Sequence, residues 1–98
     1  MATLYKVRQP NETIGFLDEV EVQPKNGTDF SLEELQGFVG GYIEIVRLNE
    51  GKIMVVNEEG KLLDLPVNLL ATIPFQLTYG PIDQIYGNAL VCKEDEVR

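Results

Sequence analysis

The sequence predicts an α+β domain, with a mostly antiparallel sheet of about five strands, one capped helix and a short second helix. Two observations lead to this prediction. Short segments rich in β-branched residues recur between turn signals along the 98 residues. One segment also combines a helix-start signal with apolar residues at helical spacing. The length suits a single domain over residues 1–98.

The amino-terminal part predicts a hairpin. Residues 3–9 alternate weakly between apolar and polar. Residues 14–22 carry apolar side chains at alternate positions, which lie on one face of a strand. Pro10-Asn11-Glu12 between these segments is a turn signal.

The capped helix follows. Ser31-Leu32-Glu33-Glu34 fits a capping box, in which the Ser31 hydroxyl accepts from the Glu34 amide and the Glu34 carboxylate accepts from the Ser31 amide. Gly40 stands where a left-handed cap ends a helix. The spacing predicts a helix over about residues 32–39.

The clearest hairpin joins residues 42–48 to residues 52–56 through Asn49-Glu50-Gly51. Both strands carry apolar residues at odd and at even positions, which point to opposite faces of the sheet. This pattern predicts that both strands lie centrally in the sheet, with both of their faces covered.

The last third predicts less regular structure. Pro66 can open a short helix over about residues 67–72. A loop containing Pro74 and Pro81 then leads to a final strand over residues 87–93. The acidic tail, residues 94–98, is expected to fray.

Composition excludes several functions. Sixteen acidic and eight basic residues give a net charge of −8, so we expect no direct nucleic-acid binding, whereas a basic protein partner is compatible with it. The chain has no histidine and one cysteine, Cys92, which we expect to be a buried apolar residue. The usual zinc, haem and iron–sulfur ligand sets and His-assisted nucleophiles are therefore missing. We expect no catalytic residue, metal or cofactor, and hence a non-enzymatic protein.

Localisation follows from hydropathy. The apolar runs are too short to span a bilayer, and the amino-terminal segment lacks the apolar region of a signal peptide. We therefore expect a cytoplasmic protein.

The Gly60-Lys61 pair raises the question of a phosphate loop, G-x-x-x-x-G-K-[ST]. Val55 stands where the first glycine should be, and Leu62 stands where the hydroxyl should be. We therefore interpret residues 57–60 as a turn, with Gly60 at positive φ.

Polar side chains near this turn form the candidate site for a ligand or partner. Tyr42 and Glu44 share one face of their strand, so they can form one patch with side chains from the turn. The alternatives are a solvated sheet edge, an Asn68 bonded to local backbone and an Asp83 that caps a turn. The candidate residues are Tyr42, Glu44, Asn57, Glu58, Lys61, Asn68 and Asp83.

Three motifs carry a resemblance to a known family: LQGFVGGYIEIV (residues 35–46), MVVNEEGKLLDLPVN (residues 54–68) and DQIYGNALV (residues 83–91). They resemble a family of small domains of unknown function that is common in bacteriophages, prophages and plasmids. The chain departs from that pattern at Asn88, where many relatives carry an acidic residue. The resemblance implies a mobile-element protein made inside a bacterium, and it implies no particular reaction.

Two functions remain open. The first is a binding protein that inhibits or sequesters a host defence or regulatory protein. The second is a sponge for a host nucleotide second messenger, held in a pocket between subunits, with Tyr42 stacking on the base and Asn57, Lys61 and Asn68 making polar contacts. We also expect a homo-oligomer, most simply a dimer, because few helices are available to cover an apolar sheet.

Overall fold

The computed structural model describes residues 2–7 and 19–97. Its elements in chain order are β1 (Ala2–Tyr5), β2 (Glu19–Val22), α1 (Leu32–Val39), β3 (Ile43–Arg47), β4 (Lys52–Asn57), α2 (Leu69–Tyr79), β5 (Ala89–Lys93) and the short 3₁₀ helix η1 (Glu94–Glu96). Within the described part, neither α-helix is long and apolar enough to cross a membrane.

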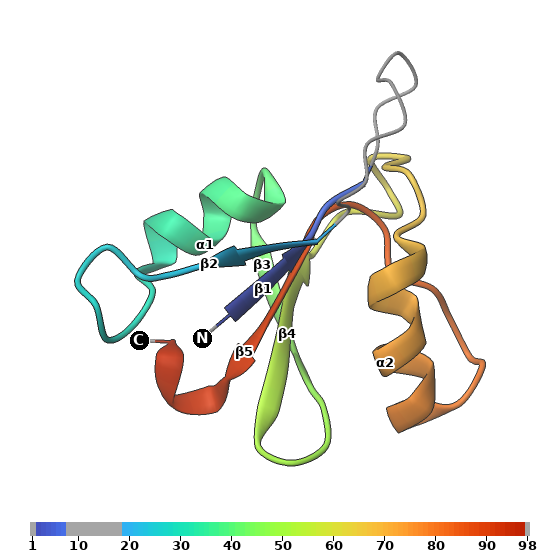
Figure 1. Cartoon of the computed structure of the whole chain (residues 1–98). Coiled ribbons are helices and arrows are strands. Elements are labelled where there is room, and N and C mark those ends of the chain that lie inside the picture. Colours follow the sequence, from blue (N-terminus) through green and yellow to red (C-terminus); the bar gives the residue numbers. More distant parts are fainter. Residues whose placement is uncertain (1, 8–18, 98) are drawn as a thin grey trace.

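The strands form one antiparallel sheet in the order β2-β1-β5-β4-β3. Helix α1 lies against one face of the sheet and α2 against the other (Figure 1). This architecture confirms the predicted α+β class and the antiparallel sheet of five strands.

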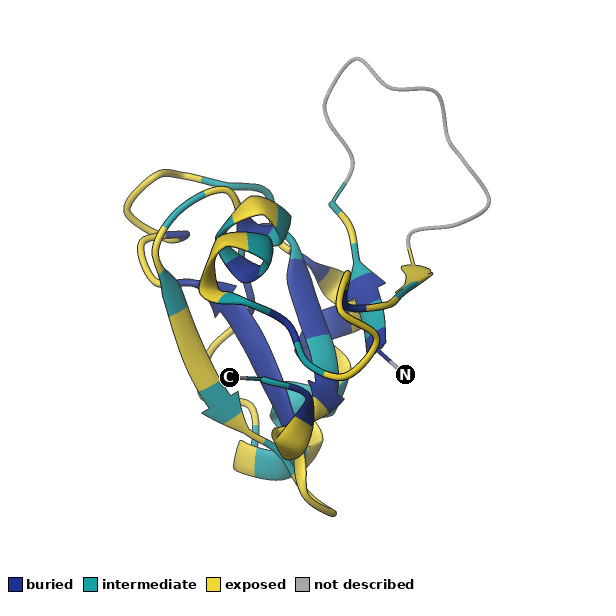
Figure 2. Ribbon diagram, turned by 90° about the vertical axis from the view of Figure 1, so that its left-hand side faces the viewer, coloured by how far each residue is buried: buried dark blue, intermediate teal, exposed yellow. Residues whose placement is uncertain are grey.

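Strand β4 has apolar residues on both of its faces because each face is covered by a core cluster. Ile53 and Val55 face the cluster under α1, whereas Met54 and Val56 face the cluster under α2. The predicted central position is therefore correct for β4. It is wrong for β3, which is an edge strand with an exposed surface, as Figure 2 shows beside the buried β4 and β5.

Helix α1 has the predicted bounds and caps. The Glu34 amide donates to the Ser31 hydroxyl at 3.2 Å, and the Ser31 amide donates to the Glu34 carboxylate at 3.1 Å. Gly40 ends the helix at φ 79°. The helix then buries Leu35 and Val39 in the core.

Helix α2 differs from the prediction, since it runs over Leu69–Tyr79 and not over residues 67–72. Pro74 lies inside this helix, although a proline lacks the N–H of a helical hydrogen bond and usually ends a helix. Two contacts offset this loss. The Asn68 side chain accepts from the Ala71 amide at 3.1 Å, and Ala71 and Thr72 are buried against the sheet.

The predictions for the two ends of the chain have different outcomes. The amino-terminal hairpin is confirmed where β1 pairs with β2, while its turn lies outside the described residues. Most of the carboxyl-terminal tail that we expected to fray has secondary structure, while residue 98 lies outside the described residues. Residues 94–96 form η1, and Val97 pairs with Phe30, whose amide donates to the Glu96 carbonyl at 2.7 Å.

Candidate functional site

A cleft of about 340 Å³ opens on the α2 face of the sheet, between α2, β3 and the segment that precedes β5. Its apolar lining comes from Val46, Val56 and Phe75. Five of the seven predicted site residues also line it. They are Glu44, Asn57, Glu58, Lys61 and Asp83.

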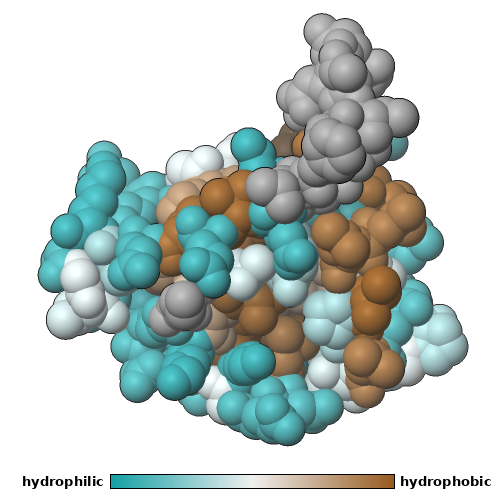
Figure 3. All heavy atoms as spheres, viewed as in Figure 1, coloured by the Kyte–Doolittle hydropathy of each residue, from teal (hydrophilic) through white to brown (hydrophobic). Residues whose placement is uncertain are grey.

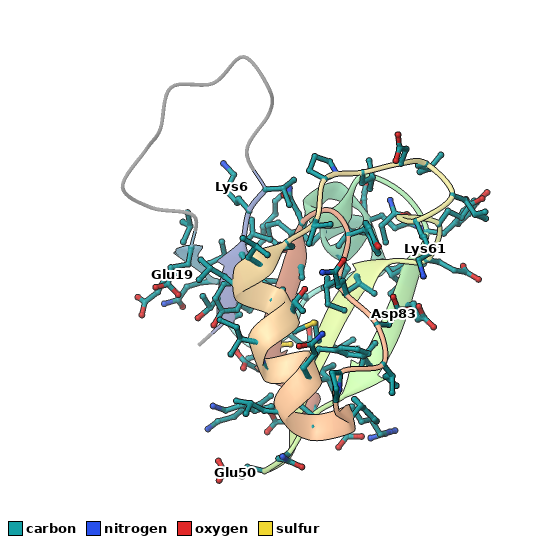
Figure 4. The ribbon with its side chains drawn as sticks, turned by 90° about the vertical axis from the view of Figure 1, so that its right-hand side faces the viewer. Lys6, Glu19, Glu50, Lys61 and Asp83 are labelled. Atoms are coloured by element: carbon teal, nitrogen blue, oxygen red, sulfur yellow. The ribbon has the colours of Figure 1, made fainter. Side chains whose placement is uncertain are left out.

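An ion pair spans one side of this cleft. The Lys61 ammonium lies 3.1 Å from an Asp83 carboxylate oxygen and 5.7 Å from the centre of the Tyr86 ring (Figure 4). The hydrogen bond to Asp83 raises the pKa of Lys61. The Gln84 amide and then Lys61 lower the pKa of Asp83. Both groups are fully charged at neutral pH, so Lys61 already has an anionic partner.

Asn57 is committed to the fold. Its side chain donates to the Val39 carbonyl at 3.1 Å and accepts from the Glu59 amide at 2.8 Å. The residue is buried, and it thereby joins the end of α1 to the turn after β4. Its amide has little freedom to turn toward a ligand.

The turn after β4 is built differently from the prediction, because Gly60 does not have a positive φ. Asp64 takes that conformation instead, at φ 56°. The Leu65 amide then donates to the Gly60 carbonyl at 3.0 Å, as at the end of a helix. Gly60 is required for space, since a Cβ atom there would lie 2.8 Å from the Tyr86 carbonyl oxygen.

Asn68 and Tyr42 lie outside the cleft. Asn68 caps α2 and donates to the carbonyls of Tyr5 and Gly87, both at 2.9 Å. The residue is buried, and its side chain bonds local backbone, as the alternative expected, only where it accepts from the Ala71 amide. Tyr42 is 67% exposed and lines a separate hollow beside Leu63.

The cleft has an acidic lining. Glu44, Glu58 and Asp83 contribute three carboxylates against the single ammonium of Lys61. No described residue forms an ion pair with the side chains of Glu44 or Glu58. Within residues 2–7 and 19–97, no group of three or more acidic or cysteine side chains comes close enough together to hold a metal ion. The cleft therefore suits a cationic or neutral group better than an anionic one.

The thiol of Cys92 is buried in the core under α1, as the sequence predicts. Burial, with the nearby Glu96 carboxylate as a smaller cause, raises the pKa of Cys92 to about 11. The thiol is therefore protonated and a poor nucleophile at neutral pH.

An exposed apolar surface lies on α2 and was missed in the sequence. Leu69, Ile73 and Leu77 recur at intervals of four residues and are 70%, 57% and 78% exposed. Leu70 extends the same outer face. Figure 3 shows apolar surface gathered along the side of the molecule where α2 lies in Figure 1. We call the four residues the α2 ridge.

A signal for the α2 ridge was present. Residues 65–82 contain no charged side chain, although 24% of the whole chain is charged. The spacing of Leu69, Ile73 and Leu77 also fits one helical face. The prediction ended the helix before Pro74 and so divided this face between a helix and a loop.

The sheet with one helix on each face, the acidic cleft and the exposed ridge define a small α+β domain. The chain belongs to the family described as Domain of unknown function (DUF3846), whose model matches residues 14–98. This match confirms the resemblance to a family of small domains of unknown function. Comparison with curated proteins found no match, and comparison with solved structures found none either.

Proposed function

We propose that this protein is a non-enzymatic binding protein of a mobile genetic element, and that it inhibits or sequesters a host regulatory or defence protein. The observation that supports this proposal is the exposed α2 ridge. Large apolar side chains grouped on one helical face commonly mark a protein-binding surface. Proteins recognise such faces by laying them into an apolar groove.

The expected partner has an apolar groove with a basic rim. Helix α2 has eleven residues, so the groove needs to extend about 16 Å. The helix itself is uncharged, whereas the chain carries a net charge of −8. In the view of Figure 4, Glu19, Glu50 and Asp83 lie around the outline of α2 together with Lys6 and Lys61, and Lys61 is paired with Asp83. A basic rim therefore gives the better electrostatic match.

A photo-crosslinking residue placed at position 77 in living bacteria tests the proposal. The same residue at Glu33, which is exposed on α1, serves as the positional control. We expect one cross-linked host protein from position 77 and not from position 33. The purified pair is then measured by calorimetry with two variants, Leu77→Ala and Leu62→Ala.

Leu62 is the matched control because it is also a highly exposed leucine, at 84%, and lies in the turn after β4, outside α2. We expect Leu77→Ala to weaken binding about fivefold or more, as loss of a central apolar contact does, and Leu62→Ala to leave it unchanged. Both variants should fold normally. Equal affinities for Leu77→Ala and the parent would refute the ridge as the binding surface.

A nucleotide sponge is the alternative function, and the cleft gives it less support. Glu44, Glu58 and Asp83 would repel a phosphate, and Lys61 would first have to leave Asp83. A thermal-shift screen against cyclic and ADP-ribose-derived nucleotides tests this alternative. A ligand at a hundred times its Kd would add about 2.7 kcal/mol to the free energy of unfolding.

A further inference from the structure

Among the described strands, β3 pairs with β4 alone, so one side of the β3 backbone has no strand partner there. Its register with β4 continues through Leu48, whose amide donates to the Lys52 carbonyl at 2.8 Å. In an antiparallel pair, bonding direction alternates along the strand. Ile43, Ile45 and Arg47 therefore direct their N–H and C=O groups away from β4, toward the free edge.

The opposite edge of the sheet carries a net negative charge on its strand, whereas the charges on this one balance. Strand β2 carries two glutamates, Glu19 and Glu21, among its four residues. Strand β3 contains one acid and one base, Glu44 and Arg47, with no proline, and its Ile45 is 46% exposed. Exposed edges of this kind pair readily with another strand.

One described side chain bonds to the backbone at this edge. The hydroxyl of Tyr79, at the end of α2, donates to the Arg47 carbonyl. A carbonyl oxygen has two lone pairs, so Arg47 keeps one acceptor position for a further bond.

We propose that β3 pairs with β3 of a second copy of this chain, antiparallel and about a twofold axis at Ile45. A strand that meets its own copy this way is self-complementary, because each outward N–H faces an outward C=O. The register centred on Ile45 pairs all three outward residues within the two strands. A shift of one residue in either direction leaves one of them beyond the partner strand.

Charge favours the same register. Each copy carries a net charge of −8, so self-association requires an edge where acidic groups do not face each other. With the axis at Ile45, Glu44 lies opposite Val46 of the partner subunit, and Arg47 lies opposite Ile43 of the partner subunit. An axis at Glu44 would instead place the two Glu44 carboxylates opposite each other, which is destabilising.

The expected dimer is weak. Five residues of β3 form the pairing region, and such a short strand buries less area than a standard stable interface of about 1,600 Å². Dimerisation should therefore depend on protein concentration. It does not depend on the host-protein proposal, which concerns a different surface.

Light scattering of the full chain at increasing concentration tests the pairing. We expect the mass to rise from that of one 11.0 kDa chain toward twice that value. Ile45→Lys, which places like charges on the axis, should keep the protein monomeric. Two controls, Val20→Lys on β2 and Leu77→Lys on the α2 ridge, should still dimerise. Circular dichroism checks that each variant is folded.

An Ile45→Cys variant gives a second readout. Directly opposite residues that exchange backbone hydrogen bonds have Cα atoms about 5.5 Å apart, which suits a disulfide. Mild oxidation should trap a covalent dimer of this variant and none of the parent, whose Cys92 is buried. A monomer at every concentration would overturn the proposal. So would a dimer that is lost in Leu77→Lys but kept in Ile45→Lys, or one that Ile45→Cys does not cross-link.

Discussion

Replacing Gly60 by alanine separates two explanations of the turn after β4. The sequence predicts that Gly60 is needed for a positive φ, whereas the structure shows that it is needed for space. An added Cβ atom would lie 2.8 Å from the Tyr86 carbonyl oxygen and 3.3 Å from the Tyr86 Cβ atom. The first of these is backbone and cannot rotate away, so the chain on one side has to move.

The expected cost follows from overpacking of a buried position. Gly60 is buried, and inserting an atom into a tightly filled site typically costs about 1–3 kcal/mol. For a domain of this size, each kcal/mol corresponds to a fall in Tm of about 4–8 °C. Urea unfolding and thermal melting of Gly60→Ala measure this loss.

Gly37 provides the matched control. It lies within α1 at an ordinary φ, and a Cβ atom there would have no heavy atom within 4 Å. Gly37→Ala should therefore stabilise the protein by about 0.5–1 kcal/mol, because alanine favours the helix. Glycine-to-alanine substitution is thus expected to lower the free energy of unfolding at position 60 and to raise it at position 37.

A second variant distinguishes steric crowding from backbone strain. Asparagine tolerates positive φ, so the strain explanation predicts that Gly60→Asn is milder than Gly60→Ala. Crowding predicts that the larger asparagine is at least as destabilising. A Gly60→Ala protein as stable as the parent, or a Gly60→Asn protein more stable than Gly60→Ala, would refute the reasoning.

Three further predictions concern stability. Asn68→Ala removes the α2 cap and leaves the carbonyls of Tyr5 and Gly87 without their donor, so it should cost about 3 kcal/mol, measured by urea unfolding. A loss below about 1 kcal/mol would contradict the assigned network. Asp64→Gly relieves a positive φ of 56° and should raise the urea midpoint by an amount equivalent to about 0.5–1 kcal/mol; no rise would mean that the turn relaxes elsewhere. Glu34 has a lowered pKa because the Ser31 and then the Lys25 backbone amides donate to it, so its stabilising contribution is present above pH 4.5 and is lost as the pH falls through the lowered pKa. Glu34→Gln should remove that part of the pH dependence, seen as a smaller difference from the parent at about pH 3 than at about pH 7.

Local signals were sufficient for α1 and for the strongest hairpin. The capping box needs only Ser31 and Glu34, three residues apart, and Gly40 supplies the ending within the same segment. The β3–β4 register is likewise set by a short turn at residues 49–51. These contacts lie close together in the sequence, so a pattern along the chain can predict them.

Strand order and the extent of α2 depend on contacts between distant residues. Nothing in the composition of β3 distinguishes an edge strand from a central one, because Ile45 is as apolar as the buried Val55 opposite it. Helix α2 continues through Pro74 because the sheet buries Ala71 and Thr72, and because the Ile85 amide donates to the Thr72 hydroxyl at 3.0 Å. From the local sequence alone, Pro74 predicts the end of the helix.

The candidate site was predicted in part for the same reason. The residues that line the cleft do come together, since Asp83 reaches Lys61 from a segment twenty-two positions further along the chain. The amides of Asn57 and Asn68, however, are used by the backbone of other elements. A buried amide has to satisfy its donors and acceptor, and partners so far away in the sequence cannot be identified from composition.

The α2 ridge remains the feature that folding alone does not explain. The core needs only the inner face of α2, where Ala71 and Thr72 are buried and Phe75 packs against the cluster under α2. Polar side chains on the outer face would keep that contact and would be easier to hydrate. Leu77 gains little from folding because it is 78% exposed, so its apolar character contributes almost nothing to the stability of the isolated domain. An uncharged, leucine-rich face on an otherwise acidic chain would be accounted for if another surface covered it, and for this reason the proposed binding surface is α2 and not the cleft.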